Sequence, residues 1–277
     1  MRIFPLCPKC KEPLLRLDNS AKCLNGHSYD YAKEGYLNLL LGASGSTHGD
    51  NRQMLLSRRA FLESGHYLPL CRATAMQAAS CTPEGGALLD IGCGEGYYTV
   101  AMREALSPSA EVCAFDISKE AVRLAAKRRA AVSFTVASAY DLPYPDHSFD
   151  TLTNLFSPLC LEQICRVLRV GGHFIMAIPE RDHLYEMKCV LYDEPYRNEP
   201  TDTVIEGFTL IDSQRLTYRM ELDGSEQIMA LFSMTPYAYR TPREGLERLR
   251  QRETLSVTAD FRLLVYRYDG IGMADAR

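Results

Sequence analysis

The sequence predicts an α/β fold with a doubly wound, mostly parallel sheet, preceded by a small unit of its own. From residue 83 onward, short apolar runs alternate with segments of helical periodicity, which is typical of strands joined by crossover helices. Before that point, closely spaced cysteines and a Gly/Ser-rich connector (42–51) set the N-terminus apart. We therefore expect an N-terminal module at 1–41, a linker and helical segment at 42–82, and one large domain at 83–277.

A D-x-G-x-G-x-G motif follows the first predicted strand of the large domain. The strand at 87–91 contains Asp90, and Gly92, Gly94 and Gly96 follow before a predicted helix begins. Such a turn lets backbone N–H groups and a helix N-terminus approach a ligand. The motif resembles the first motif of class I S-adenosylmethionine-dependent methyltransferases. A tight glycine turn in another kind of α/β protein is the alternative interpretation.

The next strands supply further candidates for a nucleoside site. Asp116 ends the second strand about twenty residues after the glycine turn, where a carboxylate accepts hydrogen bonds from ribose hydroxyls. An ordinary helix N-cap is its alternative role. In related methyltransferases a polar residue and an aspartate after the third strand contact adenine, which makes Ser138 and Asp141 candidates. The expected strands are 111–117, 132–137, 149–156 and 172–179, followed by an antiparallel pair at 208–222 and 256–269.

The first 41 residues carry the spacing of a metal site, with ligand candidates Cys7, Cys10, Cys23 and His27. Two close cysteines and a later Cys/His pair converge into a closed tetrahedron that suits a structural zinc ion. A unit this short needs the ion to fold, and four protein ligands leave no open position for catalysis. The alternative, a redox pair with His27 as a bystander, lacks the βαβ pattern that it requires. We expect the module to serve recognition.

Composition limits the cellular setting and the class of partner. The chain has 46% hydrophobic and 24% charged residues and shows neither a membrane-length apolar stretch nor a secretory leader, so a cytoplasmic protein without membrane association is expected. Ten dispersed cysteines fit a reducing compartment. The net charge of −4 argues against wholly electrostatic binding of nucleic acid but allows a local basic groove. Candidate phosphate contacts, or solvated helix faces, are Arg52, Arg58 and Arg59.

The order of the motifs resembles the RlmA (RrmA/TlrB-type) family of 23S rRNA guanine-N1 methyltransferases. The zinc pattern, AKEGYLNLL, RRAFLESGHYLPL, LLDIGCGEGYYT, GFTL and MTPYAYR follow one another over most of the chain. The resemblance implies a ribbon that grips a 23S rRNA hairpin and a homodimer that forms a cleft for it. It also implies that Tyr67 and His183 line the S-adenosylmethionine pocket beside Gly94 and Glu95. The segment HGDN (48–51) favours the Gram-positive branch of the family.

The proposed chemistry needs a route for one proton. Guanine N1 becomes nucleophilic only when its proton leaves, so a carboxylate near the fourth and fifth strand ends is a natural base. Glu180 and Asp182 are the candidates there, with surface loop acids as the alternative. The target base must also leave its stack, and Phe156, Tyr185 or Tyr67 are candidates to stack on it, if they are not core aromatics.

Two rival functions remain open at this point. One is a class I methyltransferase acting on a small quinone-type molecule, since DLPYPDHSFD also occurs in that group. The zinc module argues against it, because such a substrate gives a recognition module nothing to hold. The other is a non-catalytic RNA-binding protein, against which the intact glycines, Asp90 and Asp116 argue.

Overall fold

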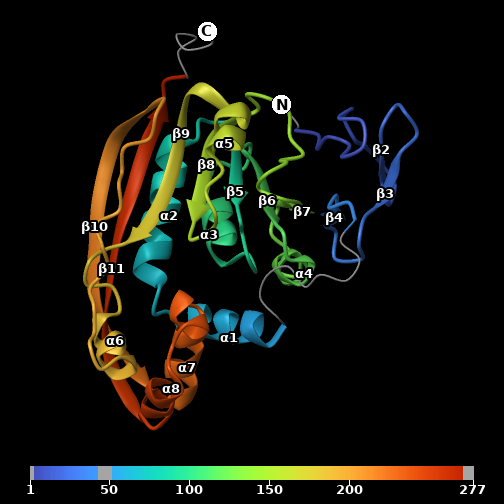
Figure 1. The fold of residues 1–277 in the computed structure, drawn as a ribbon. Helices are drawn as coiled ribbons and strands as arrows, with labels where there is room; N and C mark the ends of the chain where they lie inside the picture. Colours follow the sequence, from blue (N-terminus) through green and yellow to red (C-terminus); the bar gives the residue numbers. More distant parts are fainter. Residues whose placement is uncertain (1–2, 43–51, 271–277) are drawn as a thin grey trace.

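One mixed eight-stranded sheet organises the computed structural model, which describes residues 3–42 and 52–270 (Figure 1). The connector at 43–51, including the HGDN segment, lies outside the described residues. The sheet order is β10-β11-β9-β8-β5-β6-β7-β4. Its strands are β4 (Leu37–Asn38), β5 (Ala87–Ile91), β6 (Glu111–Asp116), β7 (Ser133–Val136), β8 (Phe149–Leu155), β9 (Leu168–Pro179), β10 (Phe208–Asp223) and β11 (Thr254–Tyr268).

The predicted parallel core is confirmed, and it places a crevice after β5. Strand β5 lies between β6 and β8, parallel to both, so the chain winds outward on both sides of it. At such a switch point the carboxyl ends of neighbouring strands diverge and leave room for a ligand. The helices are α1 (Arg52–Glu63), α2 (Leu68–Cys81), α3 (Tyr97–Ala105), α4 (Lys119–Ala126), α5 (Leu161–Val167), α6 (Tyr185–Leu191), α7 (Ser225–Ser233) and α8 (Arg243–Arg250), with a short 3-10 turn at Pro236–Tyr239.

The antiparallel pair expected at the sheet edge is also confirmed. Strand β11 pairs with both β9 and β10, and β10 forms the outer edge. Between them the chain makes α7, the 3-10 turn and α8, which gather with α6 at one end of the long hairpin (Figure 1). This small helical lobe stands beside the carboxyl ends of the parallel strands and supplies one wall of the cavity described below.

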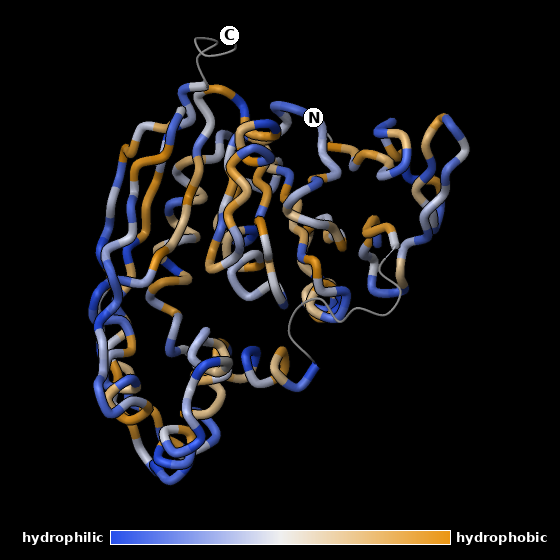
Figure 2. Tube along the Cα trace, in the orientation of Figure 1, coloured by the Kyte–Doolittle hydropathy of each residue, from blue (hydrophilic) through white to orange (hydrophobic). Residues whose placement is uncertain are grey.

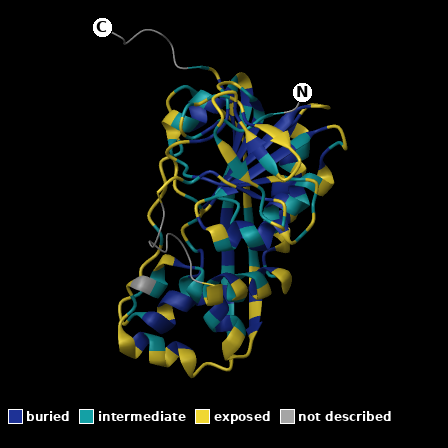
Figure 3. Ribbon diagram, turned by 90° about the vertical axis from the view of Figure 1, so that its right-hand side faces the viewer, coloured by how far each residue is buried: buried dark blue, intermediate teal, exposed yellow. Residues whose placement is uncertain are grey.

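Apolar side chains fill both faces of the central sheet. Every residue of β5 is buried, as expected for a central parallel strand covered on both sides. The orange segments of Figure 2 follow the inner strands, and Figure 3 shows the same strands as buried. Helices α2 and α3 pack together on one face. In contrast, most residues of β10, which forms the outer edge of the sheet, are exposed.

The N-terminal module is attached to the sheet rather than standing apart from it. Strands β1 (Leu15–Leu17), β2 (Ser20–Lys22) and β3 (Ser28–Asp30) form a small antiparallel sheet. The module's last strand, β4, pairs in parallel with β7 through Leu37 and Asn38. The backbone N–H of Leu6 also donates to the Pro143 carbonyl at 2.8 Å. The predicted domain boundary after residue 41 stays a prediction, but the end of the module extends the main sheet.

Two element boundaries differ from expectation. The sequence 119–130 as a whole has helical periodicity, but α4 ends at Ala126, and Arg129 soon afterwards adopts a left-handed φ of 55°, a conformation that interrupts helical geometry. The fifth strand begins at Leu168 rather than 172, because Leu168 already pairs with Phe149 directly after α5. Among the described helices, none combines the length and apolarity that crossing a bilayer requires.

Candidate functional site

Four side chains of the N-terminal module converge on one point. The ligand atoms of Cys7, Cys10, Cys23 and His27 all lie within 4.8 Å of one another. The Cys10 and Cys23 sulfurs are 3.6 Å apart, and each lies 3.4 Å from His27 Nδ1. Zinc bonds of about 2.0 to 2.3 Å in a tetrahedron require separations of this size. The donor set therefore fits a structural zinc ion, with Nδ1 as the histidine ligand.

The surroundings of Cys7 favour its thiolate form. Burial opposes ionisation, but the Tyr29 hydroxyl, 3.5 Å from the sulfur, and backbone N–H groups of Lys9 and Cys10 lower the pKa of Cys7 to about 6. A thiolate is the form that binds a metal ion. Tyr29 thus supports the ligand set from outside it.

The glycine turn after β5 is shaped by close packing. Gly92 has a φ of 69°, and a Cβ there would lie 2.4 Å from the Ser157 Cβ. Gly96 has a φ of 86° and presses against Ala125 of α4. Both positions therefore require glycine for space and for backbone conformation. Ser157 ties the next loop to the turn, since its hydroxyl donates to the Ile91 carbonyl at 2.9 Å.

Asp116 joins the end of β6 to the glycine turn. Its Oδ2 accepts the Gly94 N–H at 2.9 Å, and its Oδ1 accepts the Ser118 N–H at 2.8 Å. A carboxylate has about four acceptor positions, so one side chain can hold the turn and also accept ribose hydroxyls. The helix N-cap itself is Ser118, whose hydroxyl accepts the Ala121 N–H. Ser118, and not Asp116, therefore caps this helix.

Asp90 lies beneath the turn and not in the cavity wall. Its side chain is buried, Oδ2 accepts the Thr99 hydroxyl at 2.5 Å, and Oδ1 accepts the Thr153 hydroxyl at 2.8 Å. Burial raises the pKa of Asp90 to about 6, against the effect of both hydroxyls. The candidate cofactor residue Asp90 thus connects α3 and β8 and fixes the turn from below.

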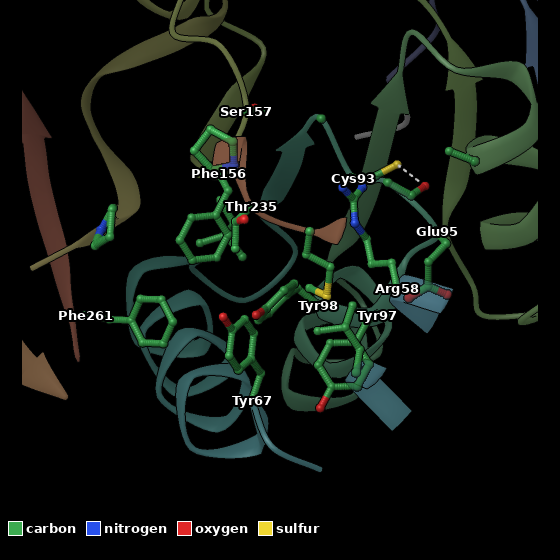
Figure 4. A pocket seen from close by; sticks show the side chains of 18 of the residues that line it. Arg58, Tyr67, Cys93, Glu95, Tyr97, Tyr98, Phe156, Ser157, Thr235 and Phe261 are labelled. Carbon is green, nitrogen blue, oxygen red and sulfur yellow. Dashed lines mark hydrogen bonds between the residues drawn. The ribbon is translucent and has the colours of Figure 1, made fainter. Parts of the chain in front are cut away.

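A cavity of about 540 Å³ opens above the turn (Figure 4). Its size is that of a small-molecule site. Figure 4 shows Tyr67 and Tyr98 side by side on one wall, with Glu95 and Arg58 on another. The candidates that line it are Tyr67, Gly92, Gly94, Glu95, Asp116, His183 and Phe156. They come from separate stretches of the chain, which the switch point of the sheet brings together.

Glu95 is held by a network of charges. Its carboxylate pairs with Arg128, which follows the end of α4, and Arg128 Nε also donates to the Glu95 carbonyl at 2.9 Å. Arg59 of α1 lies 3.9 Å from the same carboxylate and pairs with Glu63. The second oxygen, Glu95 Oε1, is buried without a hydrogen-bond partner. A buried acceptor left unpaired is costly, and its place in the cavity wall favours a ligand with a donor.

His183 is neutral and fixed in one tautomer. Burial lowers the pKa of His183 to about 3, against the attraction of Asp260 and with the repulsion of Lys188. Nδ1 accepts the backbone N–H of Asp260 at 3.3 Å, so the proton of the neutral ring is on Nε2. The ring packs 4.4 Å from that of Phe261. His183 therefore offers the cavity an N–H donor without charge.

Besides Asp90, four polar candidates from the sequence lie outside the cavity wall. Asp141 is exposed and pairs with Lys11 of the N-terminal module, and Ser138 instead forms a turn with Asp141. Glu180 pairs with Arg262 at 2.5 Å and Asp182 pairs with Arg197. The expectation that these groups reach the adenine or the reacting base is therefore not supported by their positions. Each points into a surface ion pair or turn, because an arginine, lysine or backbone group meets it there.

The three stacking candidates differ in position. Phe156 lines the cavity, is 50% exposed and adopts a left-handed φ of 63°, which is uncommon for an aromatic residue. Tyr67 also lines it but is buried, edge-on between Phe61 and Phe261. Tyr185 is covered by Arg197, 4.2 Å from its ring, and lies outside the wall. Phe156 is therefore the one of the three whose ring is open to a stacking partner.

Several wall residues were missed by sequence reasoning. They are Tyr98, Tyr196, Asn198, Thr235, Tyr237 and Phe261. The Tyr98 hydroxyl is buried without a hydrogen-bond partner, so it too favours a polar ligand. The MTPYAYR motif contains Thr235 and Tyr237, and it was a signal for this wall. Asn198 follows an irregular stretch without periodicity, and nothing in the sequence marked it.

The cavity residues fit S-adenosylmethionine. A Cβ at Gly94 would meet nothing within 4 Å, so the turn leaves open space where a ligand approaches the backbone. Asp116 suits the ribose hydroxyls, and the unpaired Glu95 oxygen, the Tyr98 hydroxyl and the His183 N–H suit polar groups of the same ligand. The wall also includes aromatic and aliphatic side chains for the adenine and the methionine chain.

Comparison with known proteins agrees with these two sites. Residues 6–41 match the model described as RlmA, N-terminal, and residues 83–224 match a methyltransferase domain. The chain is 33% identical to the 23S rRNA (guanine(748)-N(1))-methyltransferase of Streptomyces fradiae over 91% of this chain and 94% of that protein. It is 31% identical to a Micromonospora griseorubida protein whose name gives the guanine-N1 activity as provisional, over 94% and 96%.

A demethylmenaquinone methyltransferase of Symbiobacterium thermophilum is 35% identical, but only over 33% of this chain and 41% of that protein. The similarity to quinone-modifying proteins is therefore confined to a part of the chain, whereas the first two relatives match nearly all of it.

Proposed function

The chain belongs to the RlmA family of 23S rRNA guanine-N1 methyltransferases, and on this premise we propose that it methylates N1 of a guanine within a hairpin of 23S rRNA. S-adenosylmethionine supplies the methyl group, and zinc stabilises the N-terminal module. The observation that carries the proposal is the coexistence of a four-ligand metal cluster and a nucleoside cavity in one chain. A small quinone-type substrate would leave the metal-binding module without a role.

The residues divide into two tasks. Asp116, the glycine turn, Glu95, Tyr67 and His183 hold the cofactor, and they orient its methyl group toward the open side of the cavity. Phe156, half exposed at the end of β8, stacks on the target base after it leaves the hairpin. Placing N1 in line with the methyl group at contact distance accounts for much of the rate.

The N1 proton has no carboxylate acceptor among Glu180 and Asp182, since both are occupied by arginines. We propose instead that the proton leaves to solvent at the open side of the cavity. The NLFSP segment (154–158) lacks the Asn-Pro-Pro-Tyr signature of amino-group methylation, which supports attack by a ring nitrogen.

Recognition of the hairpin is assigned to the N-terminal module. It is joined to the sheet through β4, and therefore holds a bound RNA in a fixed relation to the cavity. A homodimer would give the hairpin a second wall, and the long exposed edge of β10 supports such an association. The rRNA substrate and ten cysteines free of disulfide bonds support a cytoplasmic location.

A transfer assay separates this function from its rivals. Zinc-loaded protein is incubated with tritiated S-adenosylmethionine and either unmodified 23S rRNA or a demethylated quinone. Incorporation into the RNA alone is expected. Incorporation into the quinone alone favours the small-molecule reaction, and binding of RNA without any transfer favours a non-catalytic protein.

A further inference from the structure

Lys188 of α6 is a buried cation next to the cavity. Its side chain is 0% exposed, and its Nζ lies 4.3 Å from the centre of the Tyr196 ring and 5.2 Å from that of Tyr237. Among the side chains that the structure describes, no carboxylate lies within 4.0 Å of it. Ring faces attract a cation but replace water incompletely, and burial lowers the pKa of Lys188. Such a costly arrangement points to a role beyond packing.

The ammonium group donates to Asn198 Oδ1 at 2.6 Å. The other end of the same amide, Nδ2, donates to the Glu180 carbonyl at 2.7 Å. An ammonium group only donates and a carbonyl only accepts, so these two partners fix which end of the amide is oxygen and which is nitrogen. Asn198 therefore retains one Nδ2 hydrogen without an acceptor among the described residues.

Asn198 lies on the side of the cavity away from the nucleoside end. It follows β9 and α6 and is held to the Arg181 carbonyl by its own N–H at 3.0 Å. Asp116 ends β6, three strands away from β9 in the sheet. With neighbouring strands about 4.8 Å apart, the two ends are separated by roughly 14 Å. Since Asp116 takes the ribose of the cofactor, the end with Asn198 is left for the target base.

The charges around this end are already paired. Glu180 and Asp182 pair with arginines, Glu186 pairs with Arg219, and Asp260 pairs with Arg215 at 2.9 Å. His183 is neutral, and the remaining titratable neighbours of Lys188 are Tyr196, Tyr237 and Tyr192. Within residues 3–42 and 52–270, the target base thus meets a hydrogen-bond donor supported by a buried cation, and no carboxylate without a basic partner.

We propose that Lys188 and Asn198 act as a pair that reads O6 of the target guanine, with Asn198 Nδ2 as the donor to O6 and Lys188 as the residue that orients and polarises it. This inference rests on the proposed function. Loss of the N1 proton spreads negative charge onto O6, so a donor there lowers the cost of forming the nucleophile. The proton goes to water, the N1 electron pair bonds the methyl carbon, and the pair of the broken C–S bond stays on sulfur.

The same pair explains specificity for the base. Adenine carries an amino group where guanine carries O6, and two donors would then face each other. Asn198 is thus a specificity-determining residue that touches the substrate, while Lys188 is a positioning residue that acts through it.

The test measures single-turnover methyl transfer against pH for the wild type, Asn198→Ala and Lys188→Met. Lys127→Met, an exposed lysine on the chain after α4, is the matched control. We expect both variants to be about 10- to 100-fold slower near neutral pH, with the rate levelling off at a higher pH, because N1 ionises with less help. Their affinity for S-adenosylmethionine stays within about twofold of the wild type by calorimetry, as does that of the control.

A second arm replaces the target guanosine by 6-thioguanosine, whose sulfur is a poorer acceptor. The substitution should slow the wild type more than Asn198→Ala, since the variant has no donor left to lose. A wild-type pH profile in both variants, or an equal effect of sulfur on both proteins, overturns the inference. If the wild type leaves guanosine RNA unmethylated, the proposed function itself fails. Asn198→Ala removes the proposed donor and also the acceptor of the Lys188 ammonium group. An unchanged affinity for S-adenosylmethionine shows that this variant is folded, and it then decides the matter even if Lys188→Met does not fold.

Discussion

Lys11 Nζ lies 2.7 and 2.9 Å from the two carboxylate oxygens of Asp141, and so joins a metal-ligand turn to the loop after β7. Both side chains are more than half exposed, so the pair contributes at most about 1 kcal/mol to folding. Its importance is positional. With the pairing of β4 and β7, it holds the N-terminal module against the sheet.

Because Asp141 contacts Lys11 and Asp116 lines the cavity, substitutions of these two aspartates should affect cofactor binding differently. Asp116→Ala should weaken binding of S-adenosylmethionine about 10- to 100-fold, because one hydrogen bond to a charged acceptor contributes about 1.5–3 kcal/mol. Asp141→Asn should bind the cofactor as the wild type does, since Asp141 faces Lys11. Titration calorimetry on both variants checks this, and equal losses would place Asp141 in the site after all.

Removal of one zinc ligand should empty the metal site. Cys23→Ser is expected to lose bound zinc, because the buried cluster then offers only three strong donors, and to lose rRNA methylation with it. Cys189→Ser is the control, since Cys189 is exposed and distant in sequence from the cluster. Metal content by mass spectrometry is the measurement. Full zinc occupancy in Cys23→Ser would contradict the ligand set.

The glycine turn predicts unequal costs for two alanine substitutions. Both Gly92 and Gly94 have positive φ values, so either change strains the backbone by about 1–2 kcal/mol. Only Gly92→Ala also collides with Ser157, which adds about 1–3 kcal/mol of overpacking. Denaturant unfolding should therefore find Gly92→Ala the less stable. A Gly92→Ala variant more stable than Gly94→Ala would mean that the loop containing Ser157 moves away at little cost in free energy.

His183 predicts a pH dependence of stability. Its pKa is about 3 in the folded protein and about 6.5 when unfolded, so below pH 6.5 the unfolded chain binds the extra proton. The resulting stability is present above pH 6.5 and is lost progressively as the pH falls toward 3. Between pH 7 and pH 5 the wild type should lose about 2 kcal/mol more than His183→Gln. Parallel curves for the two proteins would show that His183 is protonated when folded.

The fold could be predicted from the sequence because the patterns that determine it are local. The Cys/His spacing, the glycines after β5 and the apolar run of Ala87–Ile91 each determine a short piece of backbone. The alternation of strands and helices predicted a doubly wound parallel sheet with its site at the carboxyl ends of the strands, and the cavity does lie there, beside Gly94 and Asp116.

The sequence did not reveal which partner each acid meets. Glu180 and Asp182 stand near the correct strand end, yet Arg262 and Arg197 reach them from segments 82 and 15 residues away. Asp141 was assigned by analogy to the adenine, and the module's own Lys11 binds it instead. Lys188 of α6 likewise contacts Tyr196 in the loop after that helix and Tyr237 in the 3-10 turn. Such pairings depend on tertiary contacts that no local pattern encodes.

The most direct test is the identity of the methylated nucleoside. Unmodified 23S rRNA is treated with zinc-loaded protein and S-adenosylmethionine, digested to nucleosides, and analysed by chromatography and mass spectrometry. The expected product is 1-methylguanosine, at about one site per RNA molecule. Methyl groups found on the guanine amino group or on another base, or an RNA without added methyl groups, would contradict the assignment of this chain to guanine N1.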